Sequence, residues 1–154
     1  IKPAGRPRTG EAGGRETIED VSGLPPVPIG GPGVPALQAG TGGGFGEGYA
    51  GNSHRNPPSG WLVAVKYLID ELHADVNGRD HEGNTALHHA AARGDNETIE
   101  FLVSRGADVK AVNRAGETTV DMANGPVQRI SPYLDTVALL ESLGAVNNHK
   151  CMSC

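Results

Sequence analysis

Two thiols near the carboxyl-terminal end of the chain are the side chains whose type and spacing most directly suggest chemistry. Cys151 and Cys154 are the only cysteines, and His149 precedes the first of them by two positions. Thiolate and imidazole groups bind zinc, and two neighbouring thiols can exchange with a disulfide. A tetrahedral metal site built on these three ligands would need a fourth ligand from elsewhere in the chain or from a second chain.

The plainest interpretation of the same residues is an exposed tail that oxidises to a disulfide. No His follows Cys154, so the C-x-x-C-H sequence that attaches haem is absent. A thioredoxin-like site would place its first thiol at the start of a helix, and no helix is predicted after Cys151. Two hypotheses stay open for His149, Cys151 and Cys154: a metal-binding or thiol-redox tail, and a tail without such a role.

A glycine-rich stretch at residues 40–48 contains the residue type that nucleotide-binding loops use to approach phosphate. No Gly-Lys-Ser or Gly-Lys-Thr sequence follows it, and no buried strand is predicted before it. Nucleotide binding is therefore not predicted, and neither is any other cofactor. We expect a flexible loop that displays polar and aromatic side chains, Phe45, Tyr49, His54 and Arg55.

The sequence does not group residues as nucleophilic catalysis requires. No Ser or Cys has a His and a carboxylate partner in a predicted cleft. The adjacent carboxylates Asp70 and Glu71 are expected on a solvated helix edge, and Glu19 and Asp20 in an extended arm. The chain is therefore predicted not to be an enzyme.

Composition limits the other classes of partner. The 154 residues are 37% hydrophobic and 20% charged, which suits one small domain and a flexible segment. The net charge is -5, and the 13 Lys and Arg residues are scattered, so no basic patch for nucleic acid or an anionic membrane is predicted. No apolar run approaches the roughly 20 residues that span a bilayer. Nucleic-acid binding and membrane insertion are therefore not predicted.

The elements that carry these residues follow from an internal repeat. A pattern that starts at residue 80 recurs 33 positions later, with the matched pairs Asp80/Asn113, Gly83/Gly116, Thr85/Thr118 and Ala90/Ala123. A period of this length is typical of a solenoid, in which stacked units bury a continuous core.

Two stretches of the first copy resemble the ankyrin-repeat consensus. Residues 80–91 read DHEGNTALHHAA, and residues 102–109 read LVSRGADV; they resemble the family's D-x-x-G-x-T-P-L-H-x-A-A and L-L-x-x-G-A-D-V-N. The resemblance implies an all-α fold of helix-turn-helix repeats and a role in binding other proteins. It also implies that His88 bonds to a neighbouring turn. Residues 79–146 are similar to the ankyrin arrays common in bacterial proteins.

We predict three repeats with a flexible Gly/Pro-rich arm before them and a Cys-containing tail after them. The arm covers residues 1–33, the repeats 34–77, 78–111 and 112–148, and the tail 149–154. The first repeat is degraded, because Pro35 and Gln38 stand where the family has Thr and His. The third repeat resembles a terminal cap, whereas no such polar cap is predicted at the amino-terminal end of the repeats. We therefore expect the carboxyl-terminal portion of a longer array, or a partner or oligomer that covers the first repeat.

Helices are expected where apolar residues recur at helical spacing. The clearest are residues 61–72, 85–93, 97–105 and 135–143. In the first of these, the predicted buried stripe consists of Leu62, Val65, Leu68, Ile69 and Leu72. Insertions separate the two helices of the first repeat, at residues 45–60, and of the third, at residues 125–133. Both insertions should lie toward one rim.

The resemblance also places a partner surface. Ankyrin proteins bind others through the turn tips and the exposed side of the inner helices. Carried onto this chain, the positions are Arg79, His81, Glu82, Asn84, His89 and Arg93 in the second repeat, and Arg114, Glu117 and Met122 in the third. Tyr49 and Trp61, beside the first insertion, are residue types that often anchor interfaces. Trp61 at a helix start is equally explained by packing.

Overall fold

The computed structural model describes residues 20–26, 34–42, 60–125 and 132–149. Those residues form helices joined by turns and loops and contain no strand, only an isolated bridge between Val112 and Thr118. The elements are α1 (Ala36–Gly40), α2 (Gly60–Lys66), the π-helix η1 (Tyr67–Glu71), α3 (Ala86–Ala92), α4 (Asn96–Ser104), α5 (Thr119–Asn124) and α6 (Leu134–Ser142). Among them, none is long and apolar enough to cross a membrane.

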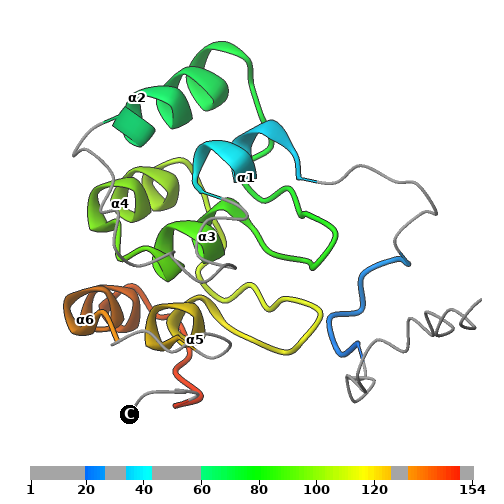
Figure 1. Ribbon diagram of the computed structural model, residues 1–154, viewed down its shortest axis with the longest axis vertical. Helices are drawn as coiled ribbons and strands as arrows, with labels where there is room; N and C mark the ends of the chain where they lie inside the picture. Colours follow the sequence, from blue (N-terminus) through cyan, green and yellow to red (C-terminus); the bar gives the residue numbers. More distant parts are fainter. Residues whose placement is uncertain (1–19, 27–33, 43–59, 126–131, 150–154) are drawn as a thin grey trace, which may run out of the picture.

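The helices stack as three pairs (Figure 1). Helix α1 packs against α2 and η1, α3 against α4, and α5 against α6. The inner helices α1, α3 and α5 follow one another in one layer, and the outer helices form a second layer. This arrangement confirms the predicted all-α solenoid of helix pairs.

Local signals set the helix ends close to the predicted positions. The Thr85 hydroxyl accepts the His88 N–H at the start of α3, and the Thr118 hydroxyl accepts the Asp121 N–H at the start of α5. Glycine in the left-handed conformation follows the last helical residues, as at Gly125, where φ is 74°. Gly125 therefore ends α5 after six residues, as the sequence predicted.

The first pair is a degraded repeat that keeps the essential contacts. Leu37 is buried, and Gln38, in the position of the expected His, donates from Nε2 to the Gly78 carbonyl at 2.5 Å. Pro35 provides no side-chain cap. A glutamine amide thus replaces the imidazole as the donor that reaches the following turn.

The second helix of this pair differs from the prediction of one α-helix over residues 61–72. It changes to a π-helix at Tyr67. In a π-helix each backbone hydrogen bond spans one residue more than in an α-helix, so the side chains that follow turn away from the predicted buried stripe. Leu62 and Val65 are buried as predicted, and Leu68 and Ile69 are partly buried. Leu72 is 57% exposed, so its predicted place in the core is wrong.

The core lies between the two helical layers. Leu87, Ile99, Leu102, Val120 and Leu140 are fully buried. The alanines of α3 lie in the same cluster, and their small side chains let neighbouring helices approach closely.

His88 links helix α3 to the third repeat. Its Nδ1 accepts the Thr85 N–H at 3.2 Å, so Nε2 carries the proton and donates to the Glu117 carbonyl at 3.2 Å. The side chain is fully buried, and burial lowers the pKa of His88 to about 4. These bonds confirm the structural role that the resemblance implied for His88.

Asp121 holds the equivalent position in the third repeat and bonds differently. Its carboxylate accepts the Thr118 N–H, and it also accepts the backbone and side-chain N–H groups of Asn148. The Thr118 hydroxyl donates to the Val146 carbonyl at 2.6 Å. Residues 146–148 therefore take the place that a further turn would occupy next to α5.

We expect acidification to destabilise the fold through His88. The pKa of this group is 6.5 when unperturbed and about 4 in the fold, so the unfolded chain binds more protons between these values. The stabilisation is complete above pH 6.5 and is lost toward pH 4, at up to about 1.4 kcal/mol per pH unit. Urea unfolding at pH 7, 6 and 5 would measure this slope.

The variant His88→Gln should lose the part of the pH dependence of the unfolding free energy that His88 contributes, whatever its absolute stability. The matched variant His81→Gln changes an exposed histidine and should keep the wild-type slope. Equal slopes in the wild type and His88→Gln would contradict the assignment.

Candidate functional site

Two turns project from the inner-helix side of the solenoid. We call residues 79–84 finger 2 and residues 112–117 finger 3. In finger 2 the Asp80 carboxylate accepts two N–H groups, from Glu82 and Asn84. In finger 3 the Asn113 side-chain oxygen accepts the corresponding pair. The two fingers are therefore built on the same local bonds, 33 positions apart.

Side chains tie the two fingers together. Arg79 donates from Nη1 to the carbonyls of Gly83 and Val112, both at 2.7 Å. The Asn113 amide donates to Asn84 Oδ1 at 2.9 Å, and the Arg114 N–H donates to the Glu82 carbonyl at 3.0 Å. The fingers thus form one continuous surface.

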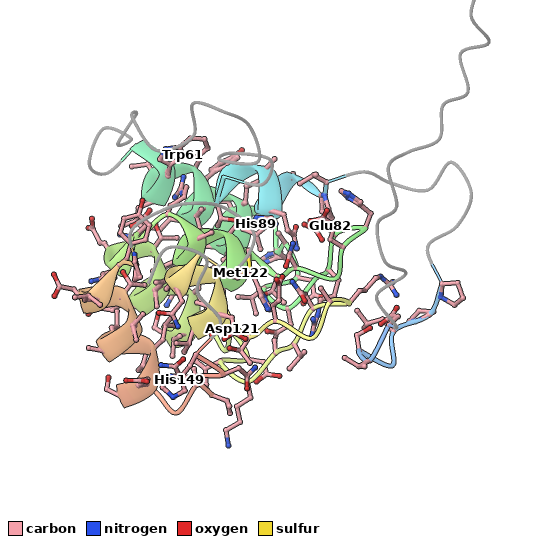
Figure 2. The ribbon with its side chains drawn as sticks, turned by 60° about the horizontal axis from the view of Figure 1, so that its bottom comes forward. Trp61, Glu82, His89, Asp121, Met122 and His149 are labelled. Carbon is pink, nitrogen blue, oxygen red and sulfur yellow. The ribbon has the colours of Figure 1, made fainter. Side chains whose placement is uncertain are left out.

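Three of the predicted partner-binding side chains are not on that surface. Asn84, His89 and Glu117 are buried, so the expectation that they point outward is wrong. Each is used inside the fold: Asn84 and Glu117 both accept hydrogen bonds from the Asn113 amide, and His89 Nε2 lies 2.7 Å from an Asp80 carboxylate oxygen. Figure 2 shows His89 close to the helices and Glu82 out on its finger.

The Asp80 carboxylate beneath the finger is charged although it is buried. Burial disfavours the charged form, but the hydrogen bond from His89 and those from the N–H groups of Asn84 and Glu82 outweigh it and lower the Asp80 pKa. The anion is therefore part of the finger's structure.

The residues that remain accessible gather at the finger tips and on α5. The side chains of His81 and Glu82 are about half exposed. Arg79, Arg114 and Met122 are partly exposed. In helix α3, by contrast, all residues from Ala86 to Ala91 are buried, so this helix contributes little accessible surface.

Arg93 also differs from its prediction as a surface residue. Its side chain is 5% exposed, and its Nη2 donates to Asp95 at 2.9 Å. The guanidinium lies 4.7 Å from the centre of the Trp61 ring, which assigns Trp61 a packing role at the start of α2. Burial lowers the pKa of Arg93, while Asp95 opposes that shift.

The ends of both predicted insertions gather around Arg93. A Cβ atom at Gly42 would lie 2.7 Å from Arg93 Cδ, and one at Gly94 would lie 2.7 Å from the Tyr133 ring. Gly42 directly precedes residues 43–59, and Tyr133 follows residues 126–131 by two positions; both ranges lie outside the described residues. Arg93 thus lies between Gly42, near the start of the first insertion, and Tyr133, at the end of the second.

We expect the charge reversal Arg93→Glu to lower the free energy of unfolding by about 3 kcal/mol. It would remove the stacking on Trp61 and place a second carboxylate beside Asp95 in a buried position. Lys110→Glu, the same reversal at an exposed position, should change stability by less than about 0.5 kcal/mol. Chemical unfolding of the two variants would compare these values, and similar losses in both would contradict the burial argument.

The carboxyl-terminal tail is described as far as His149. Its side chain is exposed, and its N–H donates to Asn147 Oδ1 at 2.8 Å. Cys151, Cys154 and Tyr49 lie outside the described residues. Within the described part of the chain, no three His, Cys, Asp or Glu side chains are grouped as metal ligands would be. Metal binding or thiol exchange by the tail stays a prediction.

Comparison with known proteins gives the same repeat type. A family model described as "Ankyrin repeats (3 copies)" matches residues 58–113. Protein phosphatase 1 regulatory subunit 12A of Mus musculus is 44% identical over 90 residues, 58% of this chain and 8% of that protein. BCL-6 corepressor-like protein 1 of Homo sapiens is 35% identical over 86 residues, 56% and 4% of the two chains.

Two further matches agree. Human ankyrin repeat and SOCS box protein 6 is 44% identical over 63 residues, 37% of this chain and 15% of that protein. A chain from the structure of a predatory endopeptidase from Bdellovibrio bacteriovorus, in complex with an immunity protein, has a TM-score of 0.54 and 24% identity. That match covers 75% of this chain and 49% of the other, and it shows a likeness of fold. The chain spans 15% or less of the length of the three relatives named.

Proposed function

We propose that this chain, an ankyrin-repeat protein, is a non-catalytic module that binds another protein through its fingers and the adjoining side of the inner helices. The observation that carries the proposal is that the polar side chains of the fingers fall into two sets. One set of polar side chains is used by hydrogen bonds within and between the fingers, and a second set, His81 and Arg114, makes no side-chain bond of that kind and differs from finger to finger.

His81 and Arg114 illustrate the second set. They occupy equivalent positions in fingers 2 and 3, yet one is an imidazole and the other a guanidinium. The turns beneath them are held by the same bonds, so the backbone is fixed while the chemistry at the tip varies. A rigid frame with variable side chains loses little conformational entropy on binding, which favours recognition of a protein surface.

The relatives support binding over catalysis. One is named as a regulatory subunit of a phosphatase and another as a corepressor-like protein, and both names describe action through association with other proteins. The matched repeats are a small part of each relative. We transfer to this chain only the general role of protein binding.

Met122 and the insertion at residues 45–60 extend the proposed surface. Met122 is the partly exposed apolar side chain of α5, and a flexible thioether adapts well to a partner. Trp61 is partly exposed where the first insertion rejoins α2, and Arg93 fixes its ring. We include Tyr49 of the insertion as a predicted contact, although its position is not described.

Photo-crosslinking at defined positions tests the proposal. A photoreactive amino acid replaces His81 or Met122 in one pair of variants, and Glu100 or Ala138 in a control pair. Glu100 and Ala138 are exposed on the outer helices α4 and α6. In the cells that make the protein, we expect covalent adducts with a second polypeptide from the first pair and not from the second.

Adducts only from Glu100 or Ala138 would move the binding surface to the outer helices. Equal adducts from all four positions would indicate non-specific contact and would contradict the proposal. Thermal unfolding of each variant, expected within a few degrees of the wild type, establishes that the comparison is between folded proteins.

A further inference from the structure

A segment of the predicted arm lies across the tips of both fingers. Residues 20–26, Asp-Val-Ser-Gly-Leu-Pro-Pro, run beside fingers 2 and 3, as Figure 1 shows for the blue segment next to the green and yellow turns. The arm was expected to be extended and flexible. The described part of it instead makes polar contacts with Arg114, about 90 residues further along the chain, and apolar contacts with both fingers.

The polar contacts converge on Arg114. Its Nη1 donates to Asp20 Oδ2 at 2.6 Å, and its Nη2 donates to the Pro25 carbonyl at 2.7 Å. The Arg114 side chain is only 20% exposed in this arrangement, and its Nε is buried without a hydrogen-bond partner. One guanidinium of the finger surface thus binds both ends of a short peptide segment.

Local bonds prepare the segment for this contact. Asp20 Oδ1 accepts the N–H and the hydroxyl of Ser22 at 2.9 and 2.5 Å, and the Leu24 N–H donates to the Ser22 hydroxyl at 3.1 Å. Gly23 allows the turn with a φ of 69°. The bonds from Ser22, followed by the one from Arg114, lower the Asp20 pKa to about 2, so the carboxylate is charged at neutral pH.

The apolar contacts fall on the repeat's equivalent glycines. A Cβ at Gly83 would lie 3.2 Å from Leu24 Cδ1, and a Cβ at Gly116 would lie 3.2 Å from Val21 Cγ2. Both glycines have positive φ, at 80° and 76°. The same turn geometry that requires glycine also leaves the tip without a side chain, and an apolar residue of the segment covers each tip.

We propose that residues 20–26 occupy, within their own chain, a peptide-binding site on fingers 2 and 3, and that a partner binds there by displacing them. The partner supplies a short peptide that turns as residues 20–26 do, with a carboxylate for Arg114 and apolar side chains one and four positions later, over Gly116 and Gly83. This inference rests on the proposed protein-binding function and adds its regulation: the site is closed until a competitor opens it.

The contact is suited to displacement. It contains one ion pair at the surface, and Val21 remains 66% exposed while it covers Gly116. Such a contact is weak by itself, but tethering raises the local concentration of the segment to the order of millimolar. A free peptide must therefore compete with the tethered one, and weakening the tethered contact should reveal the site.

The experiment uses the full chain and the acetylated, amidated heptapeptide DVSGLPP as the probe. The double variant Asp20→Ala/Leu24→Ala removes the carboxylate and one apolar contact of the tethered segment. We expect peptide added to a few millimolar to shift the NMR amide signals of Gly83, Gly116 and Arg114 in this variant. Half-saturation should require about tenfold less peptide than in the wild type.

Charge changes at the finger identify the contact. In the double variant, adding Arg114→Glu should abolish binding of DVSGLPP, and a peptide with Lys in place of its Asp should restore it. Adding Lys110→Glu instead, a charge reversal at an exposed residue outside fingers 2 and 3, should leave binding of DVSGLPP unchanged.

Absence of peptide shifts in the double variant would overturn the proposal, and so would equal half-saturation in the wild type and the double variant. A dimer that forms with increasing concentration and exchanges residues 20–26 between chains would also overturn it, because a second copy would then be the occupant. Crosslinks from His81 and Met122 without peptide binding would refute self-occupation and leave the proposed function standing. Peptide binding without those crosslinks would support self-occupation of the site by residues 20–26 and would contradict the proposed binding of a second protein.

Discussion

The fingers depend on side chains that reach from one repeat into the next. A finger is a short turn with few backbone partners of its own, and its buried N–H and C=O groups must nevertheless be paired. Arg79 and His88 provide that pairing across the boundary between the second and third repeats, and Asn113 donates across the same boundary to the Asn84 side chain. Nearest-neighbour contacts of this kind explain why a single repeat of a solenoid does not hold its shape alone.

The same constraint determines which residues are available for recognition. Side chains that satisfy the turn cannot also meet a partner, and this removes Asn84, His89 and Glu117 from the accessible surface. What remains is concentrated at the tips, where His81 and Arg114 stand above equivalent backbones. The proposed recognition is therefore confined to side chains that the hydrogen bonds between fingers 2 and 3 do not use.

The sequence predicts the parts of this structure that repeat and misses those that occur once. The 33-residue period and the spacing of apolar residues were sufficient for the helix pairs, and Gly125 for the short α5. The burial of His89 depends on a specific pairing with Asp80, which a consensus pattern does not specify. The burial of Arg93 depends on where two unrelated insertions join the helices. The docking of residues 20–26 joins a Gly/Pro-rich stretch to a finger 94 positions away, and no local signal marks that contact.

Equivalent positions in the second and third repeats hold His88 and Asp121, and this difference makes the two repeats unequal in what can follow them. An imidazole can donate to the carbonyl of the finger that follows, whereas a carboxylate can only accept, and here it accepts from Asn148. A copy of the second repeat moved to follow the third would bring a carbonyl oxygen to a carboxylate, and two acceptors would face each other in a buried place. The order of the repeats is thus fixed by whether the side chain at each boundary is a hydrogen-bond donor or an acceptor. Repeats of nearly equal shape therefore cannot be exchanged freely.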